Sequence, residues 1–141
     1  MVVKNFKRSR EDLDLKQKDI AKTLKVHFST VSGWETGKDT IPLKQLIKYA
    51  NHYKISLDYL LGFTSKNKYI ELDVNLKEVG KKLRILRKRH SFTQEQIAER
   101  LNTSQSAYAH YEGGMYLITT YFLYALLKIY GDVSADYIFK K

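Results

Sequence analysis

The chain has 141 residues, no cysteine and a formal net charge of +10. The lack of cysteine excludes disulfide and thiolate chemistry. No apolar run of 18 residues occurs and the N-terminus has no apolar signal core, so we expect no membrane span and a cytoplasmic protein. The positive charge favours an anionic partner, either nucleic acid or a membrane surface.

An internal repeat organises the chain. Residues 92–101, FTQEQIAERL, repeat residues 15–24, LKQKDIAKTL, at an offset of 77 positions. Further pairs keep the same offset: Arg10 and Arg87, Ser29 and Ser106, Glu35 and Glu112, Gly37 and Gly114. A repeat of this length indicates two copies of one small module. We therefore expect domains over residues 1–63 and 76–141, joined by a linker over residues 64–75.

Charge and order differ along the chain. Residues 1–69 have 14 basic and 7 acidic residues, net +7, whereas residues 70–141 have 11 and 8, net +3. The linker is polar and mixed without being rich in glycine or serine. We expect it to be partly ordered, packed through Tyr69, Ile70 and Leu72.

Five helices are predicted in the first copy, over residues 2–12, 17–24, 28–36, from Pro42 onward, and 57–61. Apolar side chains recur at helical spacing in each. The predicted core positions are Phe6, Leu13, Ile20, Ala21, Leu24, Val31, Trp34, Leu43, Leu46, Ile47 and Ala50. Gly37 is a predicted helix C-cap, Pro42 a first helical residue, and Ser56 an N-cap for a last helix that ends at Gly62.

The second copy repeats this plan. Helices are predicted near residues 76–90, 94–101, 105–112, 119–130 and 134–139. No strand pattern occurs in either copy, so the predicted fold class is all-α. In each copy the second and third helices are short and joined by a tight turn, with Ala21 or Ala98 at the crossing. This arrangement is typical of a DNA reader whose second helix enters the major groove.

Both copies resemble the Cro/phage-repressor (XRE-type) helix-turn-helix family. The matched pattern is Arg, six residues, Gln-x-x-Ile-Ala-x-x-Leu, a turn, a polar helix, then Glu-x-Gly. It covers nearly the whole chain apart from the linker, and it occurs twice in register. The resemblance implies two tandem five-helix, lambda-repressor-like domains that bind double-stranded DNA.

The residues of each copy suggest its DNA contacts. Gln17 and Gln94 open the second helices, where a side-chain amide can hold a phosphate oxygen, and the resemblance also implies this role. Other expected contacts in the first copy are Lys16, His27, Phe28, Ser29, Ser32, Gly33 and Lys38. Those in the second copy are Thr93, Ser104, Gln105, Ser106, Ala109 and His110. The resemblance also implies that Arg10–Glu35 and Arg87–Glu112 are structural ion pairs.

The chemistry expected at these positions differs from one residue to the next. Gln105 can contact adenine through two hydrogen bonds. Phe28 cannot hydrogen-bond, so it contacts a thymine methyl group or serves only in packing. The resemblance places a phosphate-contacting lysine at Lys38, whereas Met115 occupies the matching position. Trp34 and Tyr111 are interpreted as core residues rather than as base-stacking platforms.

Residues 116–130, YLITTYFLYALLKIY, contain one charged residue, Lys128. A surface helix normally has a polar face, so this one indicates a partner surface or a face covered by the first copy. The core face is assigned to Leu123, Leu126, Leu127 and Tyr130. The outward residues, and a possible homodimer surface, are then Tyr121, Phe122, Tyr124 and Ala125.

Two functions fit these observations. The first is a sequence-specific, DNA-binding transcriptional regulator. The alternative is a protein-interaction module, antitoxin-like or anti-repressor, in which one or both copies keep the fold without reading DNA. No catalytic arrangement, cofactor motif, metal-ligand spacing among the four histidines, or small-molecule site is evident, so we expect no enzyme, no metal and no cofactor.

Overall fold

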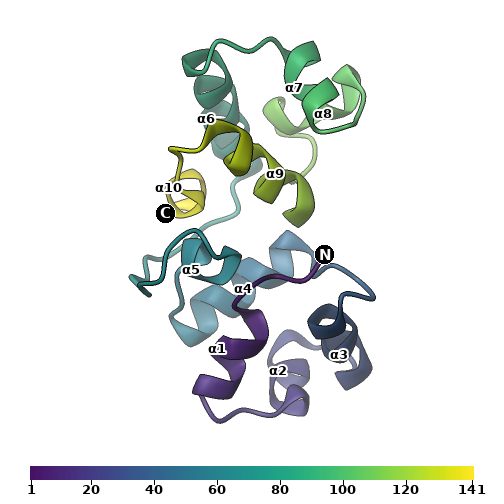
Figure 1. The fold of residues 1–141 in the computed structure, drawn as a ribbon, viewed down its shortest axis with the longest axis vertical. Helices are drawn as coiled ribbons and strands as arrows, with labels where there is room; N and C mark the ends of the chain where they lie inside the picture. Colours follow the sequence, from purple (N-terminus) through teal and green to yellow (C-terminus); the bar gives the residue numbers. More distant parts are fainter. The chain divides into compact units, whose positions relative to one another are not determined.

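A computed structural model describes all 141 residues and contains ten helices and no strand. The chain therefore has the predicted all-α fold. It forms two compact units, Met1–Leu72 (unit 1) and Asp73–Lys141 (unit 2), with five helices each (Figure 1). Unit 1 contains α1 (Phe6–Asp12), α2 (Gln17–Leu24), α3 (Phe28–Thr36), α4 (Leu43–Tyr53) and α5 (Leu57–Leu61). Unit 2 contains α6 (Leu76–Arg89), α7 (Gln94–Arg100), α8 (Gln105–Glu112), α9 (Thr120–Tyr130) and α10 (Ala135–Phe139).

The first helix is shorter than predicted, beginning at Phe6 instead of residue 2. Asn5 donates its backbone N–H to the Leu60 carbonyl over 3.0 Å and its side-chain amide to the Tyr59 carbonyl over 2.8 Å. These bonds hold the preceding residues against α5 in a non-helical conformation. The prediction that Leu13 faces inward was wrong: it lies just after α1 and is 43% exposed.

The helix ends in unit 1 follow local backbone chemistry. Gly37 ends α3 with φ of 85°, a left-handed conformation that glycine adopts without steric cost. The Ser56 hydroxyl accepts a hydrogen bond from the Tyr59 N–H and begins α5. Pro42 is the N-cap of α4, one residue earlier than its predicted role as the first helical residue, because its ψ of 142° is extended.

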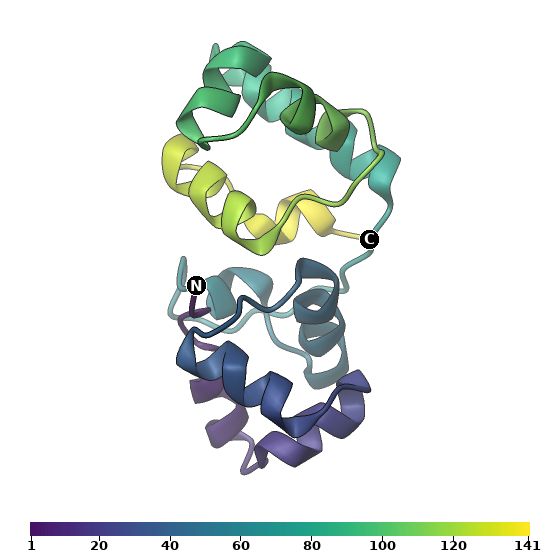
Figure 2. The same ribbon diagram turned by 90° about the vertical axis from the view of Figure 1, so that its right-hand side faces the viewer.

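The core of unit 1 is aromatic at its centre. The Phe6 ring contacts Trp34 edge-on at 6.2 Å and Tyr49 at 4.7 Å between centroids. The buried Tyr49 hydroxyl lies 2.6 Å from the Ser9 hydroxyl, so its polar atom is satisfied. Burial raises the pKa of Tyr49 to about 12. Helices α2 and α3 pack side by side at one end of this unit (Figure 2), with Ala21 buried between neighbours.

The segment after α5 is ordered against unit 1. Asn51 bonds both the N–H and the carbonyl of Leu72, at 3.0 and 2.9 Å, and accepts from the Tyr69 hydroxyl at 3.0 Å. Leu72 is buried, as predicted. Ile70 is 38% exposed, so its predicted packing role was wrong. Asn75 is the N-cap of α6, its side chain accepting from the Glu78 N–H.

In unit 2, α6 crosses the end of α8 at Gly80. A Cβ atom at Gly80 would overlap the Glu112 carbonyl oxygen, so only glycine allows this approach. The core face of α9 is as predicted, with Leu123, Leu126 and Leu127 buried. No helix in either unit has the length and apolar character needed to cross a lipid bilayer.

Candidate nucleic-acid interface

A hydrogen-bonded network joins three helices of unit 1. Arg10, on α1, donates from Nε to Glu35 Oε2 over 2.7 Å and from Nη2 to Oε1 over 2.9 Å. Its Nη1 donates to the Leu15 carbonyl over 2.8 Å. Gln17, the first residue of α2, donates its amide to Glu35 Oε1 over 3.1 Å. The hydrogen bond to Glu35 raises the pKa of Arg10, which keeps the guanidinium charged.

Unit 2 contains the same network. Arg87 donates to both oxygens of Glu112, over 2.6 and 3.1 Å, and to the Phe92 carbonyl over 2.8 Å. Gln94 donates its amide to Glu112 Oε1 over 3.1 Å. Burial disfavours the ionised Glu112 carboxylate, but the hydrogen bonds from Arg87 and Gln94 outweigh it and lower the pKa of Glu112.

These networks fix the residues that open α2 and α7. The carboxylates of Glu35 and Glu112 are 3% and 4% exposed, and each bonds an arginine and a glutamine from two other segments. Each glutamine amide therefore has a set direction at the helix start. One amide hydrogen bonds the carboxylate, which leaves a second hydrogen able to donate to an external oxygen.

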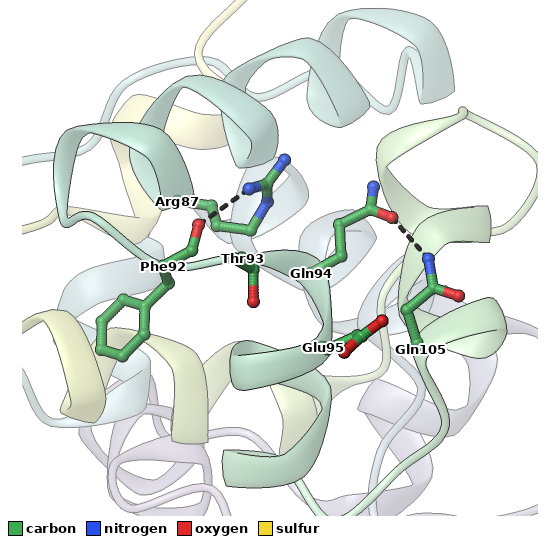
Figure 3. Close-up of a pocket in the computed structure, with 6 residues that line it drawn as sticks. All are labelled: Arg87, Phe92, Thr93, Gln94, Glu95 and Gln105. Carbon is green, nitrogen blue, oxygen red and sulfur yellow. Dashed lines mark hydrogen bonds between the residues drawn. The ribbon is translucent and has the colours of Figure 1, made fainter.

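The surface of unit 2 has an open pocket of about 420 Å³ at the starts of α7 and α8. Its lining comprises Arg87, Phe92, Thr93, Gln94, Glu95 and Gln105 (Figure 3). Gln105 donates its amide to Gln94 Oε1 over 2.7 Å, so the first residues of the two helices are joined directly. Gln105 is exposed apart from this bond. Its amide plane is consequently held while its remaining donor and its acceptor stay accessible.

The other predicted contacts of unit 2 surround this pair. Thr93 caps α7, its hydroxyl accepting from the Gln96 N–H over 3.1 Å. Ser104 caps α8, and its hydroxyl lies 3.3 Å from that of Ser106. Both serines are exposed. Further along α8, Ala109 and His110 are half-buried, and the His110 ring meets Tyr116 edge-on at 5.5 Å.

The start of α3 in unit 1 has a different surface. Phe28 is 55% exposed and its ring packs on that of His27 at 4.6 Å between centroids. His27 Nδ1 lies 2.7 Å from the Ser29 hydroxyl and accepts from the Ser29 N–H over 3.2 Å. The polar groups of His27 and Ser29 are thus bonded to one another. No counterpart of the Gln94–Gln105 bond can form, because Phe28 occupies the matching position.

Further along α3, the predicted contact residues are less exposed. Ser32 is half-buried. Gly33, expected to contact DNA, is buried, and a Cβ there would lie 3.3 Å from an oxygen of the Asp39 carboxylate. Lys16 and Lys38 are exposed at the two ends of the α2–α3 pair, whereas Met115, at the position matching Lys38, is 57% exposed and uncharged.

Family models agree with this geometry. A helix-turn-helix model matches residues 6–60, and a helix-turn-helix domain model matches residues 80–141. The chain belongs to the helix-turn-helix family, as two XRE-type domains in tandem. No curated protein and no solved structure matches it. Helix-turn-helix domains are generally DNA-binding and non-enzymatic, and the structure contains no group of three His, Cys, Asp or Glu side chains placed to hold a metal.

The aromatic surface of the second helix-turn-helix domain lies on α9. Tyr121 is 55% exposed, and Phe122, Tyr124 and Ala125 are half-buried. The Phe122 ring lies 6.3 Å from Tyr111, which is itself half-buried, and 6.0 Å from Tyr121. At the positions matching Tyr121 and Ala125, the first domain has Lys44 and Lys48, both exposed. The apolar surface is therefore specific to the second domain.

One cluster in this domain was not predicted. His90 ends α6, stacks on Tyr130 at 4.2 Å between centroids, and bonds the Leu86 carbonyl and Asp132 Oδ1, each over 2.7 Å. Both partners are acceptors, so the two bonds form together only when both ring nitrogens carry hydrogen, as in the imidazolium form. The Leu86 and Asp132 bonds raise the pKa of His90. Asp132 is 42 positions away, and no local spacing signals the pair.

Proposed function

We propose that this chain is a sequence-specific transcriptional regulator that acts in the cytoplasm and places α3 and α8 in the major groove of double-stranded DNA. The observation that carries the proposal is the Gln94–Gln105 bond. This bond fixes the orientation of the exposed Gln105 amide in the first turn of α8, the part of a recognition helix that contacts base edges.

The chemistry of this amide fits adenine. One Gln105 hydrogen bonds Gln94, which leaves one hydrogen for adenine N7 and the carbonyl oxygen for the N6 amino group. A correctly paired contact of this kind discriminates against another base by about 1–3 kcal/mol. In unit 1, the exposed Phe28 ring supports apolar contact with a thymine methyl group.

Contacts with the DNA phosphate backbone would set the position of the protein along the duplex. Gln17 and Gln94 each have a second amide hydrogen for a phosphate oxygen, and both are held in place by a buried carboxylate. The net charge of +10 supplies attraction that does not depend on sequence.

The direct test is selection from a random double-stranded DNA pool at near-physiological salt. We expect an enriched motif containing adenine, lost in Gln105→Ala and altered in Gln105→Glu, which has the same shape but no donor. Glu99→Gln, an exposed change on α7, is the control and should keep the motif. Absence of enrichment, with binding that vanishes as salt rises, would support the alternative of a protein-interaction module.

We further propose that the regulator is a homodimer joined through the outward face of α9. The support is the exposed aromatic surface around Tyr121, present where the first domain has lysines. Light scattering after gel filtration should give twice the chain mass for the native protein and the monomer mass for Tyr121→Glu. Lys44→Glu, the matching position in unit 1, is the control. A native monomer at micromolar concentration would refute the dimer.

A further inference from the structure

We propose that the two units divide the work on DNA: unit 1 holds the phosphate backbone by charge, and unit 2 supplies most of the base discrimination. This inference rests on the proposed function and extends it. The two copies can be compared position by position, because matching residues lie on equivalent helices and each copy contains its own Arg–Glu–Gln network.

The first contrast is the charge beside each glutamine. Lys16 and Lys18 flank Gln17, and both are exposed. Thr93 and Glu95 flank Gln94 at the matching positions, and Glu95 lines the pocket at the start of α7. A phosphate held by Gln17 therefore meets two cations, whereas one held by Gln94 meets a carboxylate. Asp19, in the same turn, is matched by the uncharged Gln96, so the helix starts have net charges of +1 and −1. This difference of two charges favours backbone binding at unit 1.

The second contrast lies beyond the reading helix. Lys38, exposed after α3, is matched by Met115 after α8. None of Lys16, Lys18 and Lys38 forms an ion pair in the structure. Each can consequently displace a counterion from DNA without first breaking an internal salt bridge. The residues of unit 2 that match these three lysines of unit 1 are Thr93, Glu95 and Met115.

The third contrast concerns base recognition, and it favours unit 2 instead of unit 1. In unit 2, Gln105 is exposed, directed by Gln94, and retains a free donor and acceptor. In unit 1, the matching Phe28 has neither, and the neighbouring Ser29 bonds His27. Gly33 is buried and has no side chain. Hydrogen-bond discrimination is therefore concentrated in unit 2.

The test uses the full chain and separates salt dependence from base preference. The double exchange Lys16→Thr with Lys18→Glu gives unit 1 the residues of unit 2. It should lower the slope of log affinity against log salt by about 1.8, corresponding to two lost phosphate contacts. Affinity for selected and scrambled DNA should fall by the same factor, so their ratio stays constant.

The reciprocal variants complete the design. Gln105→Ala should lower the ratio of selected to scrambled affinity at least tenfold and leave the salt slope unchanged. Phe28→Ser should lower that ratio less than threefold. The exchange Thr93→Lys with Glu95→Lys, the matched control, should raise the slope.

Two results would overturn the division: a constant slope in the unit 1 exchange, or a larger loss of preference in Phe28→Ser than in Gln105→Ala. If the native chain itself shows no preference for any DNA, the proposed function fails. A native chain that prefers its selected site, combined with either of the two results above, overturns only the division between the units.

Discussion

Gln105 and Gln94 are the first residues of α8 and α7, and the amide of Gln105 donates to Oε1 of Gln94 over 2.7 Å. Gln94 in turn donates to Glu112. A chain of hydrogen bonds therefore runs from the buried Arg87–Glu112 pair to a side chain at the protein surface. The orientation of an exposed amide is in this way set from inside the domain.

This relationship predicts that Gln94 and Gln105 act as one unit. Gln94→Ala and Gln105→Ala should each reduce discrimination at the adenine position by about 1–3 kcal/mol. The double variant should lose little more than either single one, because each change removes the same oriented amide. Competition binding with the selected site and its adenine-substituted form measures this. Fully additive losses would show that the two side chains contact DNA independently.

The buried ion pair of unit 2 should dominate its stability. Glu112→Ala leaves the Arg87 guanidinium buried without its carboxylate, and we expect a loss of about 3–5 kcal/mol in the free energy of unfolding. Urea denaturation followed by circular dichroism measures it. Glu78→Ala is the control: its pair with Lys81 is exposed and should contribute less than about 1 kcal/mol.

Stability should also depend on the charge of His90. Its pKa is raised in the folded state by the Leu86 carbonyl and Asp132, so the contribution is fully present below the unfolded value of about 6.5. It is lost as the pH rises through the folded pKa, above that value. Arg89 opposes the raised pKa, and Tyr130 covers one ring face.

An NMR titration of the His90 ring gives the folded pKa, and urea denaturation at several pH values gives the stability. The difference in unfolding free energy between the native chain and His90→Gln should shrink as the pH rises. This subtraction removes the other three histidines from the comparison. A difference that stays constant from pH 5 to 9 would contradict the imidazolium assignment.

Gly80→Ala provides a test of the α6–α8 crossing. In an ordinary helix interior this change stabilises by about 0.5–1 kcal/mol. Here the new methyl group would overlap the Glu112 carbonyl, so we expect a loss of about 1–3 kcal/mol. Thermal unfolding decides the sign. Gly131→Ala has open space around it and should show only the cost of its left-handed backbone, φ of 80°.

Local sequence signals predicted most of the fold. Cap residues such as Ser56 and Gly37 set helix ends, and apolar spacing identified Ile20, Leu24 and Trp34 as core residues. The errors have long-range causes. Residues 2–5 look helical in isolation, but Asn5 bonds carbonyls of α5, more than 50 positions away. Gly33 lies on the polar side of a helix pattern, and only the folded turn shows Asp39 covering it.

The candidate site likewise has residues that the local sequence predicts and contacts that depend on the tertiary structure. Gln17 and Gln94 were identifiable from the repeated pattern, because a helix start has a recognisable sequence. The Gln94–Gln105 bond and the His27–Ser29 pairing depend on where two side chains meet. The cluster of His90, Tyr130 and Asp132 left no trace in the sequence, because its members come from the ends of α6 and α9.

The Arg–Glu–Gln networks have a consequence for how such a chain diversifies. In each domain the network lies beneath the surface that we propose reads DNA, and only one of its residues, the glutamine, also reaches that surface. Apart from the bond between Gln105 and Gln94, residues 28, 29 and 32, or 105, 106 and 109, take no part in the network. Transplanting the side chains of residues 105, 106 and 109 to positions 28, 29 and 32 should therefore move the proposed binding preference from the second domain to the first.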